Sequence, residues 1–197
     1  MKMLTIICAI AALSFSVASA ADITAQAGVN YDWWDDTAGN KAHQTYVPLQ
    51  LYVPYQDFSV RVLGGYTSTN RTIAGVGKFS MDTFIDTKLN LSYEIIGKLP
   101  VDILLGLDFN LPTGKTKLSE KQLTLIMDPD LVTITTFGEG FDVNPVVTVA
   151  KQWGSWSAGI GVGYSWRGDY DYSKIITDFT PGDILNVNAE VRYEISP

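Results

Sequence analysis

Hydrophobic and polar residues alternate along most of the chain in segments of about ten residues. In segment 183–195, one face carries Leu185, Val187, Ala189, Val191, Tyr193 and Ile195. The opposite face carries Asn186, Asn188, Glu190, Arg192 and Glu194. A period of two is typical of a β-strand with one apolar face. Eight segments show it: 23–34, 45–53, 58–68, 82–96, 101–110, 142–153, 156–166 and 183–195. The sequence therefore predicts an all-β, antiparallel fold of about eight strands.

The connections between these segments alternate in length. Residues 54–57, 97–100 and 154–155 form short connections, whereas 35–44, 69–81, 111–141 and 167–182 form long ones. Short turns at one end and long loops at the other are typical of transmembrane β-barrels of the bacterial outer membrane, where the short turns face the periplasm. A soluble secreted β domain is the competing interpretation, because its strands also alternate.

The stretch SWSAGIGVGYSW at residues 155–166 has three glycines at a spacing of two. A dinucleotide-binding loop needs Gly-x-Gly-x-x-Gly followed by an amphipathic helix, and neither is present. As a strand, the stretch places its glycines on the inner face. Its ten steps from Trp156 to Trp166 rise roughly 26 Å at a tilt of about 40°, close to the height of an apolar membrane band. The aromatic residues predicted to lie at the two membrane interfaces are Phe58, Tyr66, Tyr93, Trp156, Trp166 and Tyr193.

Charged residues of both signs lie on the predicted inner face. They are Arg61, Asp86, Lys88, Glu94, Asp102, Asp108, Glu190 and Arg192. In a narrow barrel these side chains would form a paired polar core, and in a wider one they would line a pore. The alternation alone leaves both arrangements open.

The N-terminal residues 1–20 have the pattern of a secretory signal peptide: Lys2, an apolar stretch, and Ala18-Ser19-Ala20 as a cleavage site. We expect one domain over residues 21–197. Cleavage would remove Cys8, the only cysteine, so no disulfide framework is expected. Loss of Lys2 would also move the formal net charge from −7 to −8, which disfavours nucleic-acid binding.

Motifs for catalysis or cofactor binding are weak. The Gly114-Lys115-Thr116 tripeptide lacks the upstream glycine of a phosphate-binding loop, since that position is Phe109. His43 is the only histidine and has no identifiable catalytic partner. Asp128-Pro129-Asp130 lacks the glycine and glutamate of an EF-hand loop. We therefore expect no enzymatic activity, no cofactor and no bound metal.

Two motifs on either side of the longest loop carry a family resemblance. Residues 106–115 read GLDFNLPTGK and residues 138–145 read GEGFDVNP. Together they resemble the outer-membrane β-barrel transporter family linked to the meta-pathway of phenol degradation, over about residues 82–195. The resemblance implies a Gram-negative barrel that admits small, often hydrophobic or aromatic molecules. The chain ends in Ser196-Pro197 rather than on a strand with a terminal aromatic residue, so we expect a truncated piece of a larger barrel of about twelve strands.

The function expected from these features is a passive outer-membrane channel or transporter for small solutes. Lumen charges and the 111–141 loop, folded over the mouth, would set its selectivity. The expected partners are outer-membrane lipid and lipopolysaccharide, the barrel-assembly machinery and the solute, with no nucleic acid. The alternative is a small structural or adhesive outer-membrane barrel that presents acidic extracellular loops. Those acidic residues are Asp35, Asp36, Asp128, Asp130, Glu139, Asp169 and Asp171.

Overall fold

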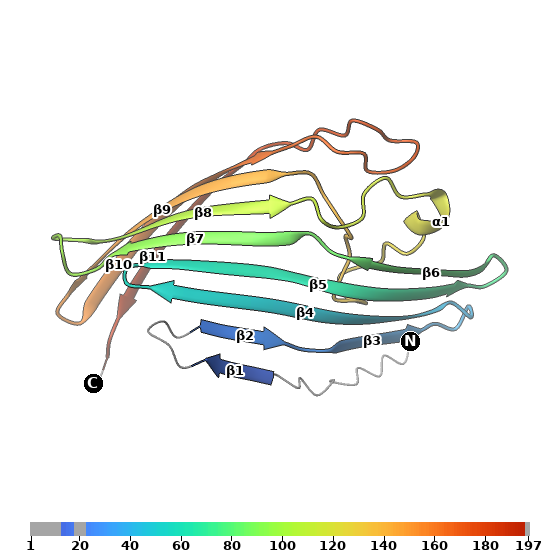
Figure 1. Cartoon of the computed structure of the whole chain (residues 1–197), viewed down its shortest axis with the longest axis horizontal. Coiled ribbons are helices and arrows are strands. Elements are labelled where there is room, and N and C mark those ends of the chain that lie inside the picture. The colour runs from blue at the N-terminus through green and yellow to red at the C-terminus, as the bar shows by residue number, and fades with distance from the viewer. Residues whose placement is uncertain (1–12, 18–22, 196–197) are drawn as a thin grey trace.

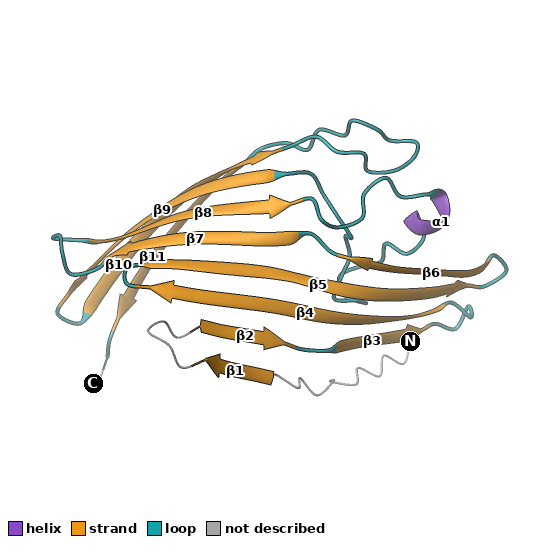
Figure 2. Ribbon diagram, in the orientation of Figure 1, coloured by secondary structure: helices purple, strands orange, loops and turns teal. Residues whose placement is uncertain are grey.

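A computed structural model describes residues 13–17 and 23–195 of the chain. These residues form one antiparallel sheet of eleven strands (Figure 1). The only helix in the described ranges is a single turn, α1 (Glu120–Leu123) (Figure 2). The strands are β1 (Leu13–Val17), β2 (Ile23–Ala27), β3 (Asn30–Asp35), β4 (Lys41–Tyr55), β5 (Phe58–Ile73), β6 (Gly77–Phe84), β7 (Thr87–Ile95), β8 (Asp102–Leu111), β9 (Asp142–Trp153), β10 (Trp156–Arg167) and β11 (Ile184–Tyr193). The prediction of an all-β antiparallel fold is confirmed.

The eight predicted segments correspond to β2 with β3, β4, β5, β6 with β7, and β8 to β11. β2 and β3 both pair with β4 in one continuous register. They are interrupted opposite Pro48, which has no backbone N–H to give to the ladder. Residues 82–96, predicted as one strand, are also divided. The two residues Gly64 and Gly65 of β5 lie opposite the three residues 85–87, because Leu63 pairs with Lys88 and Tyr66 with Phe84.

This extra residue is a β-bulge, and it changes which side chains face inward. Phe84 points outward and is 60% exposed, and Leu89 is on the outer face after the bulge. Strict alternation through the predicted segment 82–96 would place Ile85 on the outer face together with Leu89. This expectation is wrong for Ile85, because it directly follows the outward-pointing Phe84 and therefore turns to the side of the inner cavity. Asp86 is buried on the same side.

The two faces of the sheet differ in polarity as the alternation predicts. Large apolar residues of the outer face are exposed, among them Leu49, Leu51, Leu105, Val147, Ile160, Val162 and Val187. In β10, Ile160 pairs with Val149 and Ala189, while the next residue, Gly161, pairs with Thr148 and Asn188 on the inner face. The outer surface is therefore largely apolar and is not covered by any other part of the described chain. Protein surfaces that face water rarely have apolar patches of this size.

The six predicted interface aromatics lie on this outer face at two levels. Toward the short turns, Phe58 pairs with Tyr93 and Trp156 with Tyr193, the latter two rings lying 4.7 Å apart between centroids. Toward the long loops, Tyr66 contacts Phe84 and Trp166 contacts Tyr164. On β4 to β6 the outer face becomes polar beyond Tyr66, with His43, Thr45, Ser68, Asn70 and Asp82 at successive positions.

The short turns and the long loops gather at opposite ends of the sheet (Figure 1). Two of the predicted long loops are shorter than expected, because β4 begins at Lys41 and β5 and β6 continue to Ile73 and from Gly77. The extensions of β5 and β6 form a hairpin with a mainly polar outer face, whereas the hairpin of β3 and β4 exposes Tyr31 and Trp33. The longest loop, which follows β8, folds back against the inner face instead of extending away from the sheet.

A closed barrel is not formed by the described residues. β11 pairs with β10 alone and β1 with β2 alone, so the sheet has two free edges. The sequence predicts a barrel with about eight strands in this chain, or a truncated piece of a barrel of about twelve strands. The described residues form an open sheet, so the barrel itself is not confirmed. An eight-strand barrel has room for little more than its own side chains. Here the inner face also receives the 111–141 loop, with Leu125 and Phe137 fully or almost fully buried.

Most of the predicted signal peptide, residues 1–12 and 18–20, lies outside the described residues. β1 falls within it and pairs with β2 in register Leu13↔Ala27 to Val17↔Ile23. Cleavage after Ala20 would therefore remove β1 and make β2 the edge of the sheet.

Candidate functional site: an inner cavity and the neck of a folded loop

A cavity of about 990 Å³ lies between the inner face of the sheet and the 111–141 loop. Strands β4, β5 and β7 to β10 supply most of its wall, and loop residues 133–139 close one side. Of the predicted lumen residues, Arg61, Asp86, Lys88, Glu94 and Asp108 line this cavity. Among the described residues, Arg61, Lys88 and Glu94 form no ion pair, and Arg61 lies over the ring of Tyr52 at 5.4 Å. Their charges therefore face the cavity.

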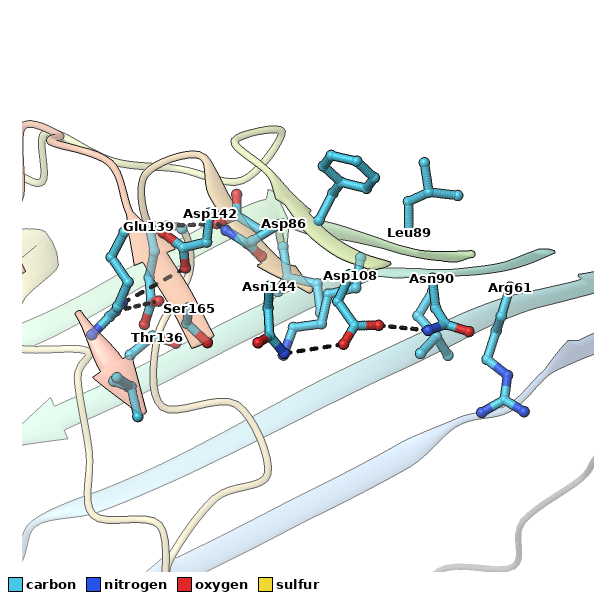
Figure 3. Close-up of a pocket in the computed structure, with 18 of the residues that line it drawn as sticks. Arg61, Asp86, Leu89, Asn90, Asp108, Thr136, Glu139, Asp142, Asn144 and Ser165 are labelled. Carbon is cyan, nitrogen blue, oxygen red and sulfur yellow. Dashed lines mark hydrogen bonds and ion pairs between the residues drawn. The ribbon is translucent and has the colours of Figure 1, made fainter. Parts of the chain in front are cut away.

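A row of amide and carboxylate side chains crosses the cavity wall (Figure 3). Asn90 Nδ2 donates to Asp108 Oδ1 at 2.6 Å, and Asn144 Nδ2 donates to Asp108 Oδ2 at 3.2 Å. These residues occupy equivalent inward positions on β7, β8 and β9, because Asn90 pairs with Asp108 and Asp108 with Asn144. The row fixes the Asp108 carboxylate in the wall. Leu89, which precedes Asn90 in β7, points away from the row to the outer face (Figure 3).

Two acceptor atoms beside this row have no hydrogen-bond donor in the described part of the chain. They are Asn144 Oδ1 and Asp142 Oδ1, both buried from solvent. The other oxygen of Asp142 is 3.7 Å from Arg167 Nε, and Arg167 Nη2 donates to Glu139 Oε2 at 2.9 Å. Buried acceptors are usually satisfied in folded proteins. Within the described chain, this corner of the cavity therefore holds two unsatisfied acceptors next to a guanidinium group.

The 111–141 loop enters and leaves the sheet through a narrow neck fastened by Asp86. The Asp86 carboxylate accepts hydrogen bonds from the backbone N–H of Gly114 at 2.7 Å and of Glu139 at 2.6 Å. It also accepts from Asn110 Nδ2 at 2.8 Å, and the same nitrogen donates to the Gly140 carbonyl at 2.9 Å. One carboxylate thus ties both ends of the loop to the sheet. Charge-assisted bonds of this kind are about twice as strong as neutral ones.

Glycines allow the two ends of the loop to touch in this neck. A Cβ on Gly114 would collide with the Phe137 carbonyl oxygen, and one on Gly138 would lie 2.8 Å from backbone atoms of Gly114 and Lys115. Gly140 and Gly168 approach each other in the same way. The two sequence motifs 106–115 and 138–145 therefore meet in space. Gly114 of the Gly-Lys-Thr tripeptide takes part in this contact.

The body of the loop packs on the inner face of β3 to β6. Its apolar residues form two clusters with the sheet: Leu118, Leu125 and Phe137 around Met81, and Met127 and Val132 around Ala42. The fully buried Gln44 forms two bonds with the backbone of Ile134, donating from Nε2 at 2.9 Å and accepting at Oε1 at 2.7 Å. Arg71 Nη1 donates to the Thr124 carbonyl at 2.6 Å. The hydrophobic core of the described chain is thus the interface between loop and sheet.

The 111–141 loop also contacts the 168–183 loop outside the strands. Lys117 Nζ donates to Asp171 Oδ2 at 2.9 Å, and the backbone of Leu118 bonds with those of Tyr172 and Lys174. The Lys117 ammonium and the Asp178 N–H hold the pKa of Asp171 below its ordinary value of 3.8. The Asp171 carboxylate in turn raises the pKa of Lys117 above 10.5.

We expect this contact to be pH-dependent at both extremes. Because the pKa of Asp171 is lowered in the folded state, its contribution is present above 3.8 and is lost as the pH falls through the lowered value. Because the pKa of Lys117 is raised, its contribution is present below 10.5 and is lost as the pH rises through the raised value. A carboxyl NMR titration of Asp171 should give a midpoint that moves up toward 3.8 in Lys117→Gln. An unchanged midpoint in that variant would contradict the pairing.

The remaining predicted lumen residues lie outside the large cavity. Asp102 accepts a hydrogen bond from the Gly97 N–H at 2.8 Å and so fastens the short turn before β8. Glu190 and Arg192 pair with each other on β11 at 2.6 Å and are 69% and 74% exposed, so this pair contributes little to stability. They line a separate hollow of about 710 Å³ with Gly159, Gly161 and Gly163, which are on the inner face as predicted.

Several residues of the site were not singled out from the sequence. Asn90, Asn110, Asn144 and Asp142 occupy inward positions of strands whose alternation was recognised, so the period of two contained the signal. Gln44 and Arg71 lie in segments interpreted as loops. Their loop partners are 90 and 53 positions away in the sequence, respectively, and no local pattern indicates such pairs.

The acidic loop residues are mostly engaged within the loops. Asp36 accepts from Ala38 and Asn40, and Asp128 accepts from the Asp130 N–H. Across the described residues there is no group of three or more His, Cys, Asp or Glu side chains arranged to hold a metal ion. In that same part of the chain, no helix has the length and hydropathy of a membrane span. His43 lies on the outer face, its ring 6.2 Å from that of Tyr31.

Comparison of the chain with protein-family models, with curated proteins and with solved structures gave no match in any of the three.

Proposed function

We propose that the sheet forms the wall of a passive outer-membrane channel for small solutes, with the inner cavity as part of the pathway. The observation that supports this most is the cavity of about 990 Å³ lined by charges without ion-pair partners in the described chain. Of the two arrangements compatible with the sequence, a paired polar core would have joined Arg61, Lys88 and Glu94 to opposite charges. Their exposure to a cavity favours a pore wall.

The outer face supports the membrane placement. Exposed aliphatic side chains occupy the middle of the strands, and aromatic residues lie toward both ends, which is the pattern of a lipid-facing surface. In hydrocarbon each unpaired backbone group costs several kcal/mol, so both free edges must be paired by further strands, of this chain or of another. Such a wider barrel would also accommodate the folded loop.

The cavity wall suggests the class of solute. Leu63, Leu104 and Phe137 line it together with Asn90, Asp108 and Asn144. A small amphipathic solute, such as an aromatic molecule with a polar substituent, would match both kinds of surface. This agrees with the hydrophobic or aromatic solutes implied by the family resemblance. The alternative of an adhesive barrel has less support, because Asp36, Asp128 and Asp171 are already bonded within their own loops.

Reconstitution into lipid bilayers and liposomes tests the proposal. We expect ion conductance and uptake of small solutes well above those of empty vesicles. Lys88→Gln should shift ion selectivity toward cations because Lys88 faces the cavity, whereas Lys78→Gln, on the outer face of β6, should not. A protein that assembles but shows neither conductance nor uptake would contradict the proposal.

A further inference from the structure

One side of the cavity is made of loop rather than sheet. Residues 133–139 line it, with Thr133, Ile134 and Thr136 among the lining residues. Figure 3 shows Thr136 and Glu139 on this side and Arg61, Asn90 and Asp108 along the strands. The cross-section of the cavity therefore depends on where this short stretch of loop is held.

The stretch is held from two directions. Gln44 fixes the backbone of Ile134 against β4, and Asp86 fixes Glu139 at the neck. Phe137, between these points, is only 2% exposed and packs in the cluster around Met81. Of the two hydrogen-bonding anchors, Asp86 alone also binds the other end of the loop, at Gly114. Asp86 lies within the bulge at residues 85–87, between β6 and β7.

We propose that the 111–141 loop is a fixed constriction of the pathway and that Asp86 is the latch that sets its position and hence the size limit for solutes. The inference rests on the proposed channel function. Asp86 acts through the loop and need not touch the solute, so it is a positioning residue. Its loss should enlarge the opening, whereas the loss of a pore charge should alter ion selectivity.

The test compares Asp86→Ala with the wild-type protein in liposomes, by swelling with a neutral monosaccharide, disaccharide and trisaccharide. Neutral probes report size and are insensitive to the lost charge. Asp102→Ala is the matched control, because Asp102 also holds a backbone N–H but at the opposite end of β8 and outside the cavity. Asp86→Asn, of nearly equal volume, is the second variant should Asp86→Ala not assemble. Amide hydrogen exchange of the loop is measured on the same samples.

We expect Asp86→Ala to raise the trisaccharide-to-monosaccharide ratio severalfold and Asp102→Ala to leave it unchanged. Exchange of the Gly114 and Glu139 amides should become faster by about tenfold or more, since each loses a bond to a charged acceptor. Unchanged exchange would show that Asp86 is not the latch. Faster exchange with an unchanged sugar ratio would show that the loop does not set the size limit, while the channel function stands. If neither protein admits any sugar or carries current, the channel function fails, and hydrogen exchange still decides whether Asp86 latches the loop.

Discussion

Replacement of Leu105 by arginine is expected to impair assembly of the protein in lipid, whereas the same replacement at the adjacent Leu104 is expected to be tolerated. Leu105 is 41% exposed on the outer face, between Tyr93 and Val147. Leu104 faces the cavity and lies opposite Glu94, which would attract an introduced arginine. An arginine on the lipid face costs about 2–4 kcal/mol at the bilayer midplane and less toward the interface.

The measurement is the free energy of unfolding in lipid vesicles by urea titration, together with the yield of assembled protein. The two variants carry the same substitution one residue apart. They have the same amino-acid composition and net charge, so a difference between them reports only the face on which the arginine lies. A loss confined to Leu105→Arg supports a lipid-facing outer surface. Equal losses in both variants, or a larger loss for Leu104→Arg, would mean that the faces have been assigned the wrong way round.

Replacement of Gly114 by alanine is expected to detach the neck of the 111–141 loop. The added Cβ would collide with the Phe137 carbonyl oxygen and lie 2.7–2.8 Å from atoms of Asp86. Backbone rather than a flexible side chain has to move, and overpacking of this kind costs about 1–3 kcal/mol. Every 1.4 kcal/mol is about a tenfold change in an equilibrium, so the detached state should be populated at least severalfold more.

Gly182→Ala is the matched control, because a Cβ at Gly182 meets no atom within 4 Å. Hydrogen exchange should show faster exchange over residues 111–141 in Gly114→Ala and no change there in Gly182→Ala. Slow exchange of the loop in both variants would show that the close contact of Gly114 with Phe137 does not exist in solution.

The strands were predictable because each one separates an apolar from a polar face. The alternation of apolar and polar residues is lost where the outer face of a strand is itself polar. Lys41 and His43 of β4, and Asn70 of β5, are polar on the outer face, so the ends of these strands looked like loops although their ladders continue. The register also shifts at the bulge, where a single extra residue moved Ile85 to the cavity side. A period of two cannot locate such a residue.

The loop was not predictable for a different reason. Leu118, Leu125, Met127, Val132 and Phe137 follow no regular period, because the segment has almost no secondary structure of its own. They are buried by packing on the sheet, through partners such as Gln44 and Arg71 that are distant in the sequence. The position of Asp86 was predictable only in part. Its inward direction followed from alternation, but its role as an acceptor for both loop ends required the three-dimensional structure.

The central claim is that this sheet is the wall of an outer-membrane barrel. The most direct test is the electrophoretic mobility of the protein from the outer-membrane fraction, compared between unheated and boiled samples. We predict that the protein is found in this fraction and changes mobility on boiling, as a detergent-resistant barrel does. Protein found only in the soluble fraction, with the same mobility before and after boiling, would contradict the account.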